Sequence, residues 1–203
     1  MIPPGRRRRV RPRPTGHWPI LDIVHEKLWP VLTGERCTLS VVSLEDAATW
    51  KAGEDEEQRR WFEFPGPAPM GNVVEAIRHW REQWAADGPL RQWGIWSNGQ
   101  LAGGVELRDR GDRRANLSYV VFPPFRRRGL ATEAISLATA WGFGNLSVDA
   151  TVAIIDERNT ASRSTAERSG FILDGPAEAW EYDESGPRLR YVLWAPNLQP
   201  GAR

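Results

Sequence analysis

Three consecutive arginines stand directly before a glycine and the start of a helix-forming stretch. The tract reads RRRGLAT over residues 126–132 and follows the apolar run LSYVVF at 117–122. A helix N-terminus presents backbone N–H groups without intrahelical partners, and its dipole favours anions. Small residues such as Gly129 and Ala131 let a ligand approach the main chain, and arginines bind phosphates. The tract therefore indicates a site for a polyanion such as a pyrophosphate, although a solvated basic turn has the same local pattern.

The elements around this tract alternate between strand and helix. A near-continuous apolar run is typical of a buried central strand, and glycines close the two helices. This half of the chain therefore predicts a central βαβ unit followed by a further helix and strands. The ranges are a strand at 117–122, a helix at 131–141, a strand at 148–155, a helix from its cap Asn159 to Gly170, a strand from Phe171, and a final hairpin of Trp180–Tyr182 with 190–194.

The first half predicts a smaller set of elements on the same sheet. Asn98-Gly99 is a strong signal for a two-residue hairpin turn. The residues before it and after it have strand character, and apolar residues at helical spacing precede them. The pattern as a whole predicts a mixed α+β domain. The ranges are a strand at 37–42, a helix from Ser43, a loop with aromatic residues at 54–70, a helix at 73–86, and strands at 92–96 and 101–107.

Three tracts resemble motifs of the GNAT acetyltransferase superfamily, in that family's order. R-x-x-G-x-A at 126–131 resembles its acetyl-CoA pyrophosphate loop, and RRRGLATEAISLATAWGF at 126–143 is similar to the RimJ/RimL-type branch. DERNTAS at 156–162 with SGFILDG at 169–175, and TGER at 33–36, resemble further motifs of that branch. The likeness covers about residues 33–196. It implies a GNAT acyltransferase fold, in which a mixed, mostly antiparallel central sheet is splayed at the acetyl-CoA site and flanked by helices.

The resemblance implies a role for each matched residue. The strand at 117–122 would contain a bulge and pair with the pantetheine arm, and a backbone N–H near Val120 or Val121 would polarise the thioester carbonyl. Asn159 would reach toward the pantetheine, and Ser162 would protonate the departing thiolate. The implied cofactor-binding residues are Tyr119, Val120, Val121, Arg126, Arg127, Arg128, Gly129, Leu130, Ala131, Thr132, Asn159 and Ser162.

Two proton-handling groups of the wider family are missing here. Asn116 stands where the family strand usually has an acid, and Ala166 stands where other branches have a general-acid tyrosine. Ser162 is then the expected catalytic acid, and Glu106 is the expected base, followed by Glu157 and Asp156. Glu106 is alternatively an ordinary exposed strand residue, and Ser162 an ordinary helix position.

The acceptor is expected to be a primary amine that attacks acetyl-CoA directly in a ternary complex. Trp61 and Phe64, in a proline-rich segment, are the candidate substrate-binding residues. A protein N-terminus and a small-molecule amine both remain open as acceptors. A different class also remains open, namely a catalytically weak acetyl-CoA-binding sensor or nucleic-acid-associated factor.

Charge is distributed unevenly along the 203 residues. Six of the 27 basic residues lie in residues 1–16, so 21 remain in the body against 26 acidic residues. Residues 1–16 are predicted to be disordered, 17–32 to link or pack, 33–196 to form the acetyltransferase domain, and 197–203 to be flexible. Nucleic acid would bind only through the arginine tail.

Composition narrows the remaining expectations. The single Cys37 excludes an intrachain disulfide framework, and the histidines lack metal-ligand spacing, so we expect no metal. No apolar run is long enough to span a membrane. We therefore expect a cytoplasmic monomer or homodimer that does not contact a membrane.

Overall fold

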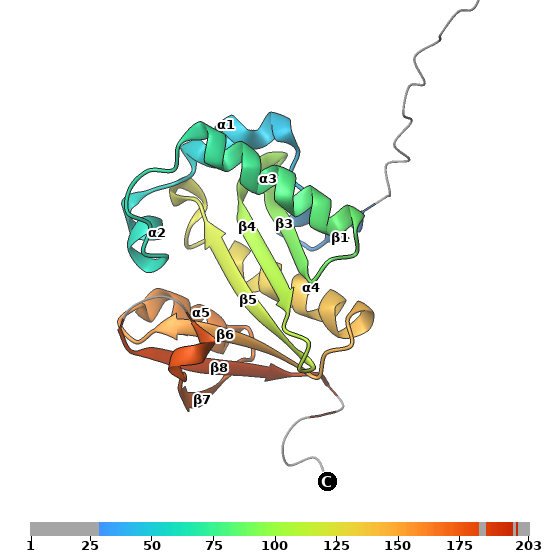
Figure 1. The fold of residues 1–203 in the computed structure, drawn as a ribbon, viewed down its shortest axis with the longest axis vertical. Helices are drawn as coiled ribbons and strands as arrows, with labels where there is room; N and C mark the ends of the chain where they lie inside the picture. The colour runs from blue at the N-terminus through green and yellow to red at the C-terminus, as the bar shows by residue number, and fades with distance from the viewer. Residues whose placement is uncertain (1–28, 183–185, 197, 199–203) are drawn as a thin grey trace, which may run out of the picture.

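The structure, a computed structural model, describes residues 29–182, 186–196 and 198 (Figure 1). The sequence-based assignments for residues 1–28, 197 and 199–203 lie outside these residues. The described residues form an eight-stranded sheet in the order β1-β2-β3-β4-β5-β6-β8-β7. The strands are β1 (Leu32–Thr33), β2 (Thr38–Ser40), β3 (Leu90–Ser97), β4 (Gln100–Asp109), β5 (Arg114–Val121), β6 (Ala150–Asp156), β7 (Ile172–Pro176) and β8 (Arg188–Trp194).

Helices cover both faces of this sheet (Figure 1). On one face, Val73 and Ile77 of α3 pack with Phe122 in a small core cluster. On the other, Ala134 and Ala138 of α4 belong to the main core cluster. The helices are α1 (Ala47–Ala52), α2 (Glu56–Trp61), α3 (Met70–Ala85), α4 (Leu130–Asn145) and α5 (Thr160–Arg168).

The sheet divides into two arms between β5 and β6. These strands form the one parallel pair among the described strands, and they pair only where Arg114–Asn116 meets Ala150–Val152. Beyond that point residues 117–121 of β5 diverge from residues 153–156 of β6, which stays paired with β8 (Figure 1). The predicted mixed, mostly antiparallel and splayed sheet is therefore confirmed.

Several local predictions were wrong. Part of the segment predicted as a loop forms α2, because the Asp55 side chain accepts the Gln58 N–H and caps a short helix. Helix α3 begins at Met70, directly after Pro69, and not at the predicted residue 73. The final hairpin pairs β8 with β7, while residues 179–181 form a 3-10 helix. The pairing of β4 with β5 keeps one register throughout, so the expected bulge is absent from β5.

Glu133 fixes the start of α4 to the turn between β1 and β2. Its carboxylate accepts the backbone N–H groups of Glu35, Arg36 and Cys37 at 2.9, 2.8 and 2.7 Å. Burial raises the pKa of Glu133, but these donors outweigh burial and the pKa is lowered overall. The pKa of the Cys37 thiol is raised to about 12 by burial and by Glu133. The carboxylate therefore holds the N-terminus of α4 at a fixed place beside the gap.

We expect Glu133→Gln to lower the free energy of unfolding by about 1.5–3 kcal/mol, because an amide removes the charge and turns an NH2 group toward N–H donors. Urea unfolding followed by circular dichroism measures this loss. Glu75→Gln is the matched control, since Glu75 forms an exposed pair with Arg78 within one helix, and we expect it to cost under about 0.5 kcal/mol. Equal effects of the two changes would contradict the anchoring role.

Candidate active site

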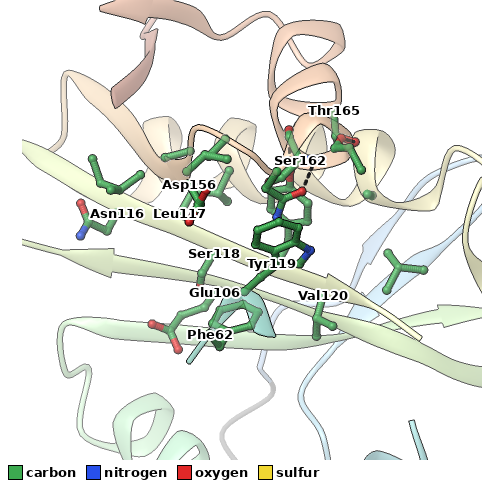
Figure 2. A pocket seen from close by; sticks show the side chains of 18 of the residues that line it. Phe62, Glu106, Asn116, Leu117, Ser118, Tyr119, Val120, Asp156, Ser162 and Thr165 are labelled. Atoms are coloured by element: carbon green, nitrogen blue, oxygen red, sulfur yellow. Dashed lines mark hydrogen bonds between the residues drawn. The ribbon is translucent and has the colours of Figure 1, made fainter. Parts of the chain in front are cut away.

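A cavity of about 1260 Å³ fills the gap between the two arms of the sheet. Its wall includes β5 and β4 on one side, β6 and α5 on the other, and the first turn of α4 between them (Figure 2). Residues of helix α2 and of the segment around Trp180 also line it. The cavity thus lies where parallel pairing stops.

Most of the predicted site residues meet in this cavity. Arg128 and Phe64 do not line it, because the Arg128 guanidinium lies over the Phe125 ring at 5.7 Å and Phe64 is half exposed. Phe62, which stacks on Phe64 with ring centroids 5.7 Å apart, lines the cavity in its place. The predicted residues that do line it are Trp61, Glu106, Tyr119, Val120, Val121, Arg126, Arg127, Gly129, Leu130, Ala131, Thr132, Asn159 and Ser162.

The first turn of α4 presents backbone donors to the cavity. Gly129 is its N-cap with φ of 78°, a left-handed conformation that favours glycine. The first N–H groups of a helix have no partner inside the helix, and here they belong to residues 130–132, which line the cavity. Local geometry therefore supplies an anion site at this end of the gap.

Arg126 is committed to other protein groups. Its Nε donates to the Val121 carbonyl at 2.9 Å, and its guanidinium donates to Glu57 at 2.7 Å and to Asp55 at 2.9 Å. Burial raises the pKa of Asp55, but hydrogen bonds from Arg126 and from the Gln58 N–H outweigh it and lower the pKa overall. This side chain therefore links the loop before α4 to helix α2, which leaves Arg127 as the arginine of this loop that faces the cavity without such pairing.

The backbone of β5 offers polar groups to the gap at alternate residues. Phe122, directly after β5, donates its N–H to Ala102 of β4 at 2.8 Å. Because such bonds alternate along an antiparallel pair, Val120 also faces β4, whereas Tyr119 and Val121 direct their N–H groups into the gap. The Val121 carbonyl, which accepts from Arg126, fits this alternation. Of the two oxyanion candidates, the geometry favours Val121 over Val120.

The start of α5 carries Ser162 into the same gap. Asn159 caps the helix by accepting the Ser162 N–H at 3.0 Å, as predicted for its capping role. The Ser162 hydroxyl lies 2.7 Å from the hydroxyl of Tyr119, which also contacts the Ser162 carbonyl at 3.0 Å (Figure 2). The Tyr119 side chain had no predicted role, because only the fold brings residues 43 positions apart together.

Glu106 lies on the opposite side of β5 from Ser162 (Figure 2). It pairs with Ser118 across the β4–β5 ladder, so its side chain shares a face with Ser118 and Asn116. Its carboxylate accepts from Arg108 at 3.2 Å. Among the other residues that line the cavity, the buried Oδ1 of Asn116 and Nε1 of Trp61 have no hydrogen-bond partner in the structure. The cavity therefore has one hydroxyl pair on one side of β5 and a carboxylate on the other.

Asp156 is poorly suited to act as a base. Its buried carboxylate accepts from Arg158 at 2.7 Å and lies 3.6 Å from Arg188. Hydrogen bonds from Arg158, together with the charge of Arg188, outweigh burial and lower its pKa to about 2. Glu157 is not among the residues that line the cavity. Of the three expected bases, Glu106 is the one whose position fits.

The comparisons with known proteins agree with this geometry. Residues 36–172 match the family described as Acetyltransferase (GNAT) domain. The chain therefore belongs to the GNAT acetyltransferase family, which confirms the resemblance found in the sequence.

Individual relatives include the uncharacterized N-acetyltransferase YoaA of Bacillus subtilis (strain 168), which is 24% identical over 79% of this chain and 93% of its own length. Spermidine N(1)-acetyltransferase of Escherichia coli (strain K12) is 30% identical over 58% of this chain and 61% of its own length. Among solved structures, Mycobacterium smegmatis RimJ in complex with CoA-disulfide superposes with a TM-score of 0.72 at 20% identity, covering 84% of this chain and 90% of that one. The likeness to RimJ is one of fold.

The described residues lack two kinds of feature. No cluster of three His, Cys, Asp or Glu among them could hold a metal ion. None of their helices combines the length and apolar character needed to cross a membrane.

The ion pairs of Asp156 predict a pH-dependent stability. Because its pKa is lower in the folded chain than in the unfolded chain, Asp156 stabilises the fold above about pH 4 and loses this effect as the pH falls toward 2. We expect Asp156→Asn to cost about 1.5–3 kcal/mol at pH 7 and to converge with the parent at low pH. Urea unfolding between pH 7 and pH 2 measures this, and a difference that stays constant across the range would contradict it.

Proposed function

We propose that this protein is an N-acetyltransferase that transfers the acetyl group of acetyl-CoA to a primary amine by direct attack in a ternary complex. The observation that carries the proposal is the gap between β5 and β6, which opens beside the unpaired N–H groups at the start of α4. The gap combines a polar strand edge with an anion site. Acetyl-CoA is an extended thioester with phosphate groups, so its binding needs both.

The cofactor would lie along this gap in a defined direction. Its pyrophosphate would accept from the N–H groups of residues 130–132 and contact Arg127. Its pantetheine amides would pair with the free backbone groups of Tyr119 and Val121, as an added strand does. The Val121 N–H would then donate to the thioester oxygen as negative charge develops there. Arg126 would act indirectly, by holding the loop through Asp55 and Glu57.

The two proton transfers of the reaction would take place on opposite faces of β5. Ser162, beyond one face, would protonate the departing thiolate. Glu106, on the other face, would accept the amine proton directly or through water. Its carboxylate also forms an ion pair with Arg108 at 3.2 Å, which holds it in place on this face. The amine would therefore enter from the side of α2, where Trp61, Phe62 and Asn116 line the cavity.

The charges in the cavity favour an α-amine over a polyamine as the acceptor. Four of the five carboxylates that line the cavity are already paired with arginines, and the fifth, Asp109, accepts the Gly111 N–H at 2.8 Å, so they offer little to a second cationic group. A protein or peptide α-amine also loses its proton more readily than a lysine-type amine, and so needs less help from a base. The four paired carboxylates are Glu57, Glu106, Asp156 and Glu181, whose partners are Arg126, Arg108, Arg158 and Arg190.

An amine panel tests this function. We expect thiol release from acetyl-CoA with short peptides that begin with serine or alanine, and turnover with spermidine at least about tenfold lower in kcat/KM. Mass spectrometry of the products should show one added acetyl group. Preferred turnover of spermidine would overturn the α-amine proposal. Tight acetyl-CoA binding without turnover of any of the three amines would support the sensor alternative.

Gly129 offers a separate test of the cofactor site. We expect Gly129→Glu to weaken acetyl-CoA binding at least about 100-fold in calorimetry, because it places a carboxylate at the proposed phosphate position and strains a left-handed residue. Gly144→Glu is the matched control, since a side chain there meets open space near the other end of α4. Thermal unfolding identifies any general loss of folding. Unchanged affinity in a folded Gly129→Glu protein would exclude this loop as the phosphate site.

A further inference from the structure

The hydroxyl groups of Tyr119 and Ser162 form a pair inside the cavity. Their oxygens are 2.7 Å apart, and the Tyr119 oxygen is also 3.0 Å from the Ser162 carbonyl. A phenol has one proton, which goes either to that carbonyl or to the serine oxygen. When Tyr119 donates to the serine oxygen, the proton of Ser162 is free to point into the gap.

The surroundings of Tyr119 keep its proton in place at rest. Burial is the main cause that raises its pKa, against lowering by hydrogen bonds with Ser162 and Thr165 and by the charge of Arg168. Its neighbour on β4 is the apolar Val105. Across the gap, β6 carries one carboxylate, Asp156, whose charge is already paired with arginines. Tyr119 is therefore a protonated phenol with one positive charge near enough to stabilise a transient phenolate.

We propose that Tyr119 acts through Ser162 as the proton source for the thiolate leaving group. This inference rests on the proposed acetyl transfer. The amine nitrogen bonds to the acetyl carbon, the C–S bond breaks, and sulfur leaves with the electron pair. Ser162 gives its proton to sulfur and takes the proton of Tyr119 in the same movement. The amine loses its proton to Glu106, which releases it to solvent, and the phenolate regains a proton from water, so the net products are an amide and the free thiol.

The relay accounts for how a weakly acidic serine serves as a donor. An aliphatic hydroxyl alone would become an alkoxide, whereas the relay leaves the negative charge on a phenol oxygen, which holds it far better. Arg168, on the same helix as Ser162, is the charge that acts on this oxygen. Tyr119 is thus a positioning and proton-supplying residue that does not itself touch sulfur.

A double-mutant cycle tests the relay, with a serine-initiated peptide and acetyl-CoA as substrates. We expect Tyr119→Phe to lower kcat about tenfold and Ser162→Ala to lower it about 10–100-fold, both with nearly unchanged KM for acetyl-CoA. In the Ser162→Ala background, Tyr119→Phe should cost less than about twofold, because its route to sulfur is already lost. Tyr191→Phe is the matched control. It removes another hydrogen-bonded phenol oxygen, one that contacts Arg163 and Glu167 on α5 away from the gap.

The outcomes separate the relay from the function on which it rests. If the parent turns over and Tyr119→Phe lowers kcat by the same factor in both backgrounds, the relay is overturned and acetyl transfer stands. The same conclusion follows if Tyr119→Phe changes KM and leaves kcat unchanged. A tenfold loss of kcat in Tyr191→Phe would also overturn it, because any buried phenol would then matter. Absence of turnover by the parent would overturn both.

Discussion

The early end of pairing between β5 and β6 is the constraint on which the site depends. A backbone N–H or carbonyl that leaves a ladder must find another partner or face solvent. Here the Val121 carbonyl finds Arg126, while the N–H groups of Tyr119 and Val121 stay directed into a wide cavity. The strand edge is thus a template for an extended ligand with amides. The rest of the fold serves to keep this edge open and to place other groups along it.

Three contacts made by arginine or glutamate side chains hold the segments around the gap in place. Glu133 fixes the start of α4 to the β1–β2 turn. Arg126 joins the loop before α4 to α2. From the other arm of the sheet, Arg188 donates to Glu63, just after α2, at 2.8 Å. The segment of α2 is therefore tied to both arms of the sheet. In the proposed function it borders the acceptor side, so the same contacts that hold the cofactor loop also set the place of the acceptor.

The features predicted from the sequence are those with local signals. Gly129 stands directly before a helix and Asn159 caps one, and both signals are visible in a few neighbouring residues. The six-residue α2 was missed because prolines and aromatic residues around it conceal a short helix held mainly by Asp55 and by Arg126. The Tyr119–Ser162 pair could not be predicted, since it depends on how far α5 leans toward β5. The same holds for Arg126, whose partners lie about 70 positions away in the chain.

The central claim is that the gap between the arms binds acetyl-CoA in one orientation, and a crystal structure of the protein with coenzyme A tests it most directly. We predict the pyrophosphate on the N–H groups of residues 130–132, the pantetheine amides paired with Tyr119 and Val121, and the thiol within hydrogen-bonding distance of the Ser162 hydroxyl. Coenzyme A bound elsewhere, or in the gap with its thiol directed away from Ser162, would contradict this account.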